Sequence, residues 1–238
     1  MPLLISHVKW NDDVYIENKK LRKKLFPLDI ELKEDVTLIV GRNGTGKTRF
    51  LRNLYDLYDL DFQARQYTEK GQTMFADEVK NELKRIRMTV ESAPDAPVFR
   101  VHLVRQDKIL AVGEYSGDML QLASHWMSSG ETREILIKRI ENCAVALRKD
   151  GVKGVMLLDE LDDGMDYKLQ AEFAKILKEA SDVLQFVVVS HNIPLISQFD
   201  EVFDIEQKKY VPTSAYLRKI LPSGIFAPAS LQNHRRRR

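Results

Sequence analysis

The sequence has a single cysteine, Cys143, so it can form neither an internal disulfide nor a metal site built from several cysteines. It has no marked excess of one charge either. Its 37 basic and 35 acidic residues leave a formal net charge of +2, which argues against a polyanion-binding surface over the whole chain. The longest apolar runs, such as Phe186–Val189, are far too short to cross a bilayer, and the start lacks the pattern of a signal peptide. We therefore expect a cytoplasmic protein that does not itself insert into a membrane.

The sequence also has no internal repeat and no sustained heptad array. Its 238 residues, of which 44% are hydrophobic and 30% charged, suit one globular domain over residues 1–238. Apolar runs of strand length alternate with segments of helical spacing, which predicts an α/β fold with a largely parallel sheet. The expected elements are strands at 36–40, 98–104, 155–158 and 183–189, helices after residue 48, over 75–90, from 131 and over 167–180, and a hairpin at 202–206 and 209–211. Residues 61–74 are ambiguous, about 107–127 form a short mixed segment, and about 212–238 form a loosely docked tail.

A glycine-rich loop carries the strongest chemical signal. Gly41–Thr48 reads G-x-x-x-x-G-K-T, directly after the buried strand 36–40 and before a segment of helical spacing. In this context the backbone N–H groups of the loop and of the helix N-terminus bind phosphates. Lys47 supplies a positive charge to the β- and γ-phosphates, and Thr48 can ligate Mg²⁺.

Two carboxylates follow a second buried strand. Val155–Leu158 ends in Asp159 and Glu160, at the edge of an open α/β sheet where ligands bind. We expect Asp159 to join the Mg²⁺ shell and Glu160 to act as the general base toward the attacking water.

Several further polar residues follow other strands or open helices. His191 comes directly after the strand 183–189, from where it could reach the γ-phosphate. Gln106 follows the strand that ends at Val104 and could sense both the metal and the water, and Gln121 is its rival for this role. Small residues around Ser128 and Gly130 open a helix, where they could act as an ordinary N-cap, as an anion site, or as both.

Together these residues resemble the ATP-binding cassette (ABC) ATPase family, with the order and spacing of its motifs over roughly residues 25–210. Gly41–Thr48 resembles its Walker A motif, Val155–Glu160 its Walker B motif, Ser128–Glu131 its signature motif, Leu161–Asp166 its D-loop and His191 its H-loop. The resemblance implies a P-loop NTPase with a RecA-like core sheet, an N-terminal antiparallel β subdomain and a reduced helical subdomain at about 107–150.

The resemblance also implies a mechanism. Two copies would meet head to tail and enclose two ATP molecules with Mg²⁺, so that Ser128 and Gly130 of one copy reach the γ-phosphate held by Lys47 of the other. Hydrolysis through Glu160, with His191 and Gln106, would reopen the dimer. The implied metal ligands are Thr48, Asp159 and Gln106. The implied nucleotide contacts are Asn43, Gly44, Thr45, Gly46, Lys47, Thr48, Ser128, Gly130 and Asp166. For adenine stacking the candidates are Trp10, Tyr15 and Phe26.

The departures from the family pattern narrow the branch. Leu161 stands where transporter subunits have proline, and the segment Glu160–Asp166 is closer to the chromosome-maintenance and RecF-like branch, which handles DNA. That branch carries a coiled coil or an arm between Gln106 and the signature motif, and only about twenty residues are available here. The four arginines at 235–238 could neutralise phosphates, or they could be a solvated end.

Three functions are therefore open at this stage. The first is a dimerising ATPase in DNA repair, genome maintenance or defence, alone or with an effector protein, and with DNA as a possible partner. The second is the nucleotide-binding subunit of a membrane transporter. The third is an ATP-gated binding or scaffold protein without productive turnover, against which the presence of Glu160 and His191 argues.

Overall fold

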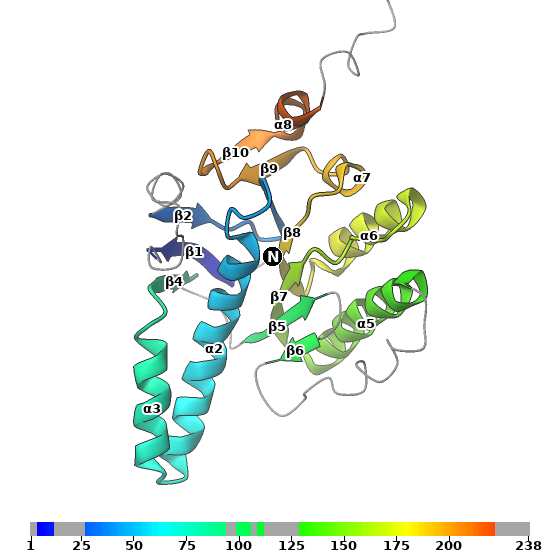
Figure 1. Ribbon diagram of the computed structural model, residues 1–238. Helices are drawn as coiled ribbons and strands as arrows, with labels where there is room; N and C mark the ends of the chain where they lie inside the picture. The colour runs from blue at the N-terminus through cyan, green and yellow to red at the C-terminus, as the bar shows by residue number, and fades with distance from the viewer. Residues whose placement is uncertain (1–3, 12–26, 94–98, 106–108, 112–128, 222–238) are drawn as a thin grey trace, which may run out of the picture.

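The computed structural model describes residues 4–11, 27–93, 99–105, 109–111 and 129–221. Their main feature is a seven-stranded sheet in the order β10-β9-β3-β8-β7-β5-β6 (Figure 1). Its five inner strands run parallel, and β10 and β6 pair antiparallel at the two edges. The strands are β3 (Val36–Val40), β5 (Phe99–Arg105), β6 (Ile109–Ala111), β7 (Lys153–Asp159), β8 (Leu184–Val189), β9 (Glu201–Asp204) and β10 (Lys209–Pro212). The predicted α/β fold with a largely parallel sheet is confirmed, as is the hairpin near the C-terminus.

A smaller antiparallel sheet lies beside the main one. It has the order β2-β1-β4, built from β1 (Ile5–Trp10), β2 (Leu28–Glu31) and β4 (Met88–Ser92). It confirms the expected small antiparallel sheet. It also shows that β4, more than fifty residues further along the chain than β2, completes that sheet.

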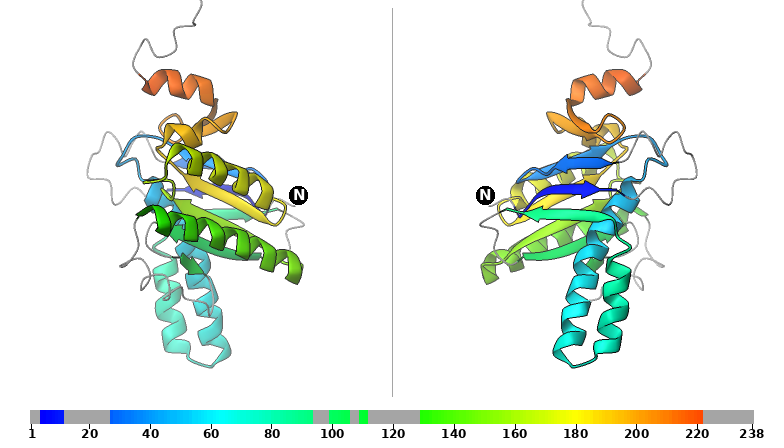
Figure 2. Two further views of the ribbon diagram at one scale, coloured as in Figure 1. Left: turned by 90° about the vertical axis from the view of Figure 1, so that its right-hand side faces the viewer. Right: turned by 90° about the vertical axis from the view of Figure 1, so that its left-hand side faces the viewer.

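The main sheet is covered on both faces, and this explains why its inner strands read as continuous apolar runs. Alternate residues of each strand belong to two separate hydrophobic clusters. Leu158 and Val188 pack with the helices α5 (Ser129–Asp150) and α6 (Tyr167–Ala180). Leu157 and Val187 pack with the helix α2 (Lys47–Glu69) and the small sheet. Figure 2 shows α5 and α6 on one face and α2 with β1 on the other. The buried face of α5 joins the same cluster as the sheet, through Ile137, Ile140, Ala144 and Leu147.

One helix prediction is wrong at its C-terminal end. Apolar residues at helical spacing from Phe75 to Val90 predict a single helix, but α3 (Thr73–Leu83) ends earlier and Val90 lies in β4. In β4, Val90 lies opposite Val8 of β1, and this pairing outweighs the local helical pattern. The ambiguous residues 61–74 are mostly helical, because α2 continues to Glu69.

Helices α2 and α3 form an antiparallel hairpin that extends beyond the sheet (Figure 1). Its turn is at Gly71, whose φ of 70° favours glycine. At the tip the rings of Tyr67 and Phe75 lie 5.8 Å apart, and Met74 and Phe75 are exposed. The sequence pattern predicts a helix on each side of residues 61–74, but it does not predict that the two helices pair and extend beyond the sheet.

The expected loose tail begins later than predicted. Residues Thr213–Ile220 form the helix α8, which buries Tyr216 and Leu217 against the end of the main sheet. Its Lys219 Nζ donates a hydrogen bond of 2.8 Å to Asp204 Oδ2 at the end of β9. Residues 222–238, including the four terminal arginines, lie outside the described residues.

A buried glutamine joins the two sheets. Gln185 of β8 has 2% of its surface exposed, and its Oε1 accepts from the N–H groups of Leu4 and Ile5 at 3.2 and 2.9 Å. Its Nε2 donates to the carbonyl oxygens of Ile5 and Lys33, both at 2.8 Å. One side chain therefore satisfies four backbone groups of the N-terminal segment.

We predict that Gln185→Leu lowers the free energy of unfolding by on the order of 3 kcal/mol, because it leaves several buried backbone groups without a partner. Urea unfolding of the variant and the wild type measures this difference. The matched control is Gln198→Leu, at a partly exposed position whose side-chain bond to Pro194 O is 3.4 Å long. Equal effects of the two substitutions would contradict the structural role of Gln185.

Candidate nucleotide site

The glycine-rich loop follows β3 and runs directly into α2. Gly46 occupies the N-cap position of α2 with φ of 87°, and no side chain caps the helix. The first N–H groups of α2 are therefore available to an anion. At Gly41 a side chain is excluded, because a Cβ would lie 2.6 Å from Cγ2 of Ile205. Gly44 also has a positive φ, of 79°, in the part of the loop that would curve around a phosphate.

Lys47 is the central cation of the loop. Its side chain is buried, and Nζ donates to the carbonyl oxygens of Gly41 and Arg42, both at 3.0 Å. Burial lowers the pKa of Lys47 to about 8, against the opposing effect of the carboxylates Glu160 and Asp159. The ammonium group is thus held on the inner side of the loop at a desolvation cost, which a bound phosphate would offset.

Thr48 and Asp159 lie together although 111 positions separate them. Thr48 Oγ1, in the first turn of α2, donates a hydrogen bond of 2.9 Å to Asp159 Oδ1 at the end of β7. A hydroxyl and a carboxylate are oxygen donors that suit Mg²⁺, which usually takes only one or two protein ligands and completes its shell with phosphate and water. These two residues therefore fit a magnesium ion bound with a nucleotide. Among the described residues there is no cluster of three or more His, Cys, Asp or Glu residues suited to a metal.

Glu160 and His191 meet beside this pair. Glu160 has φ of 52°, a strained value for a residue with a side chain, and its N–H donates to Val189 O at 3.0 Å. Its Oε1 lies 2.9 Å from Nε2 of His191, without the alignment of a hydrogen bond. Burial and the charge of Lys47 lower the pKa of His191, whereas Glu160 acts to raise it. The net effect is a pKa below the ordinary value of 6.5, which favours the neutral imidazole.

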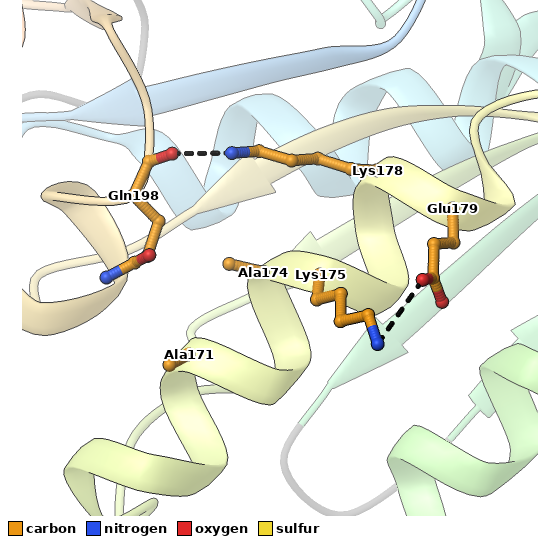
Figure 3. A pocket seen from close by; sticks show the side chains of 6 residues that line it. All are labelled: Ala171, Ala174, Lys175, Lys178, Glu179 and Gln198. Carbon is orange, nitrogen blue, oxygen red and sulfur yellow. Dashed lines mark hydrogen bonds and ion pairs between the residues drawn. The ribbon is translucent and has the colours of Figure 1, made fainter.

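A hollow of about 280 Å³ opens onto these groups. It is lined by Asn43, Glu160, Asp162, Asp163, His191 and Asn192. Asn43 comes from the glycine-rich loop, so the structure brings loop, carboxylate and histidine to one cavity. A second hollow, of about 350 Å³, lies on the outer side of α6 (Figure 3), where Lys178 Nζ donates to Gln198 O and Lys175 pairs with Glu179. None of the residues that line it belongs to the glycine-rich loop or to the predicted site.

Two of the predicted nucleotide contacts have their side chains occupied within the chain. Thr45 is buried, and its Oγ1 donates to Arg42 O at 2.8 Å, so it shapes the loop from inside. Asp166 is the N-cap of α6, where its Oδ1 accepts from Leu169 N–H at 2.8 Å. A contact of Asp166 with a nucleotide across a dimer stays a prediction.

The described part of the chain does not test the remaining predicted residues. Gln106, its rival Gln121 and Ser128 lie outside the described residues, as do Tyr15 and Phe26. Gly130 lies in the first turn of α5. Their assigned roles therefore stay predictions.

Trp10 does not provide a free surface for adenine. It has 1% of its surface exposed and packs edge-on against Phe50 of α2, with the ring centroids 5.8 Å apart. Its ring also lies against the loop, because a Cβ at Gly46 would be 3.5 Å from Cη2 of the indole. Trp10 thus supports the loop from the core and does not stack on a base.

Sequence reasoning missed a salt bridge at the start of the loop. The Arg42 guanidinium donates to both carboxylate oxygens of Glu206, with the shortest distance 2.8 Å, and the Arg42 N–H donates to Oε1 at 3.1 Å. These bonds lower the pKa of Glu206 to about 2. They attach the loop to the β9–β10 turn, and no sequence signal links residues 164 positions apart.

The fold and the site together define a P-loop nucleotide-binding domain. Residues 88–197, less than half of the chain, match the family described as "AAA domain, putative AbiEii toxin, Type IV TA system". The chain is 23% identical over 226 residues to the glutathione/L-cysteine transport system ATP-binding/permease protein CydC of Haemophilus influenzae. That match covers 85% of this chain and 37% of CydC. This chain thus spans little more than a third of the length of this curated relative.

One solved structure has a similar overall fold. The fold is similar to that of a bacterial Atm1-family ABC exporter with ATP bound, with a TM-score of 0.51 and 14% identity over 92% of this chain and 41% of that chain. The SmcHead bound to the C-winged helix domain of ScpA has a TM-score of 0.47 and 12% identity over 90% of this chain and 99% of that chain. These comparisons show a P-loop nucleotide-binding fold that is similar to those of ABC- and AAA-type ATPases, a class that binds ATP with Mg²⁺. No helix in the described ranges is both long and apolar enough to span a membrane.

Proposed function

We propose that this chain hydrolyses ATP as one half of a head-to-tail homodimer, and that the dimer acts on nucleic acid in DNA repair, genome maintenance or defence. The observation that carries the proposal is the meeting of two pairs at one edge of the sheet. Thr48 lies against Asp159, and Glu160 lies against His191, beside the buried ammonium of Lys47. These are the groups that hydrolysis of a phosphoanhydride requires.

The residues divide the chemistry among them. Lys47 and the N–H groups at the start of α2 would bind the phosphates, and Thr48 and Asp159 would hold Mg²⁺, which neutralises charge on them. Glu160 would accept a proton from the attacking water as the oxygen–phosphorus bond to the γ-phosphate forms and the bond to the leaving ADP breaks. His191 would use a ring N–H as a hydrogen-bond donor to the phosphoryl oxygens.

A second copy is proposed as the partner that closes the site. Asn43 and Asp163 line the cavity, and Tyr167, four residues after Asp163 in the sequence, has 68% of its surface exposed. An exposed aromatic residue next to an open polar site suits an interface core. ATP would be bound between two copies, with the small residues near Gly130 supplied by the partner.

The proposed role in nucleic-acid handling or defence rests on three observations of different kinds. Leu161 replaces the proline of transporter subunits, and the sequence ends in four arginines at 235–238. The family that matches residues 88–197 is described as a putative toxin of a type IV toxin–antitoxin system, which favours defence.

Turnover of ATP by the full chain, measured with and without duplex and single-stranded DNA at low and high salt, tests this proposal. We expect Mg²⁺-dependent hydrolysis, an ATP-dependent doubling of the mass in solution, and stimulation by DNA that fades as salt rises. Hydrolysis and dimerisation that are indifferent to DNA and RNA at low salt would contradict the nucleic-acid role. Absence of any Mg²⁺-dependent hydrolysis would contradict the ATPase itself.

A transporter subunit is the second candidate, and the match to CydC favours it. Because this chain covers only part of that ATP-binding/permease protein, a separate membrane partner would be needed. Copurification of the tagged chain with an integral membrane protein, together with hydrolysis that the membrane protein stimulates, would support this function over the first.

A further inference from the structure

We propose that Asp162 and Ser190 are a pair of positioning residues that fix the turn of Glu160 to the turn of His191. Asp162 lines the hollow, but its carboxylate accepts a hydrogen bond from Ser190, and neither residue is assigned a contact with the nucleotide. Both would act through their neighbours in the sequence. The inference rests on the proposed ATPase function and deepens it.

The two residues lie at the ends of adjacent strands. Strands β7 and β8 run parallel, with Asp159 opposite Val189, so the turns that follow them leave the sheet side by side. Asp162 has 1% of its surface exposed and Ser190 has none. Ser190 Oγ donates to Asp162 Oδ2 at 2.5 Å, joining residues 28 positions apart.

Each residue is placed to control one catalytic group. Ser190 Oγ also accepts from the N–H of Asn192 at 3.0 Å. The hydroxyl of the residue before His191 is therefore bonded to the backbone of the residue after it. On the other turn, Asp163 N–H donates to Glu160 O at 3.2 Å, which places Asp162 inside the turn that Glu160 begins. The Asp162–Ser190 bond therefore connects the backbone of Glu160 with that of His191.

The geometry of the site needs such a connection. Glu160 has a strained φ of 52°, and its carboxylate must stay 2.9 Å from the His191 ring although the two side chains come from different turns. A strained conformation persists only where its surroundings over-determine it. Burial raises the pKa of Asp162, against hydrogen bonds from Ser190 and Asn192. A buried carboxylate is costly, and its side-chain hydrogen-bond partners here, Ser190 and Asn192, are the two residues that flank His191.

The test uses Ser190→Ala, Ser190→Thr, Asp162→Ala and the double variant Asp162→Ala/Ser190→Ala. We expect Ser190→Ala to lower kcat by about 10- to 100-fold, as expected when positioning of a catalytic group is lost, with the Kd for ATP within about twofold of the wild type. Ser190→Thr keeps the hydroxyl and should retain most of kcat. The kcat of the double variant should be no lower than that of the slower single variant. The reason is that Ser190→Ala, Asp162→Ala and the double variant all lose the same hydrogen bond.

Ser181→Ala is the matched control. Ser181 is also a buried serine, and its Oγ donates to Lys178 O at 2.7 Å, but it lies at the far end of α6. Its removal should leave kcat and Kd unchanged. Three results would each overturn the positioning role. They are a loss of kcat in Ser181→Ala equal to that in Ser190→Ala, a rise in the Kd for ATP of Ser190→Ala as large as its loss of kcat, and additive losses of kcat in the double variant.

A second measurement keeps this inference separate from the proposed function. Titration of His191 by NMR in the nucleotide-free protein requires no turnover. Since burial lowers the pKa of His191, release of its turn in Ser190→Ala should raise that pKa toward 6.5, whereas Ser190→Thr should not. If the wild type fails to hydrolyse ATP but the pKa of His191 shifts as expected, only the proposed function is lost. If the wild type hydrolyses ATP and the pKa and kcat of Ser190→Ala are unchanged, only the positioning pair is lost.

Discussion

Glu160→Gln is expected to bind ATP with unchanged affinity, to lose hydrolysis by about 10²- to 10⁴-fold, and to accumulate as an ATP-bound dimer. The amide has the shape of the carboxylate but cannot accept the proton of the attacking water. Since Glu160 adopts a strained backbone conformation that glutamine can adopt equally, the substitution removes the base and preserves the turn. Single-turnover hydrolysis and the mass in solution with and without ATP measure both effects.

Glu172→Gln provides the control for this experiment. Glu172 is an exposed glutamate on α6, outside the cavity, and its neutralisation should leave turnover and mass as in the wild type. Unchanged hydrolysis in Glu160→Gln would remove Glu160 from the role of base. Lost hydrolysis without an ATP-dependent dimer would keep the base and contradict the dimer.

Lys47→Met is expected to weaken ATP binding by on the order of 100-fold or more, because it removes the buried charge that faces the phosphates. It should not lower the unfolding temperature of the nucleotide-free protein at pH 7. Burial lowers the pKa of Lys47 to about 8 from its ordinary value of 10.5, so at pH 7 the folded state bears the full cost of the buried cation. As pH rises from 8 to 10.5, Lys47 loses its proton in the folded wild type and this cost is relieved. Any excess of the unfolding temperature of Lys47→Met over that of the wild type should therefore become smaller over this pH range.

Binding is measured with a fluorescent ATP analogue, and stability by thermal unfolding without nucleotide. The matched variant is Lys178→Met, which also removes a lysine that donates to a backbone carbonyl, that of Gln198, but far from the loop. It should bind ATP normally. A Lys47→Met protein that unfolds several degrees lower would show that the lysine is mainly a structural donor to Gly41 and Arg42.

The sequence predicts the parts of the fold in which local pattern and burial agree. Strands β3, β7 and β8 are buried on both faces, so they read as apolar runs, and the groups that follow each run meet at one edge of the sheet. For this reason Thr48 with Asp159, and Glu160 with His191, could be predicted as neighbours.

The rest depends on contacts that no local pattern reports. Strand β4 forms because Val90 pairs with Val8, and a helical spacing from Phe75 onward gives the opposite indication. The bond between Asp162 and Ser190 is visible in the sequence only as one more acid after a strand and one serine before a histidine. Trp10 is a candidate for stacking by residue type alone, and only its burial against Phe50 excludes that role.

The helix that receives the phosphates is also the inner helix of the projecting hairpin. Helix α2 runs without a break from Lys47 to Glu69, so the nucleotide site and the hairpin tip are the two ends of one rigid rod (Figure 1). At 1.5 Å per residue this rod is about 35 Å long, and a tilt of about 10° at the loop would move the far end by about 6 Å. If the helix moves as one body, a small change in how the loop holds its ligand would displace the exposed residues Met74 and Phe75 by several ångströms.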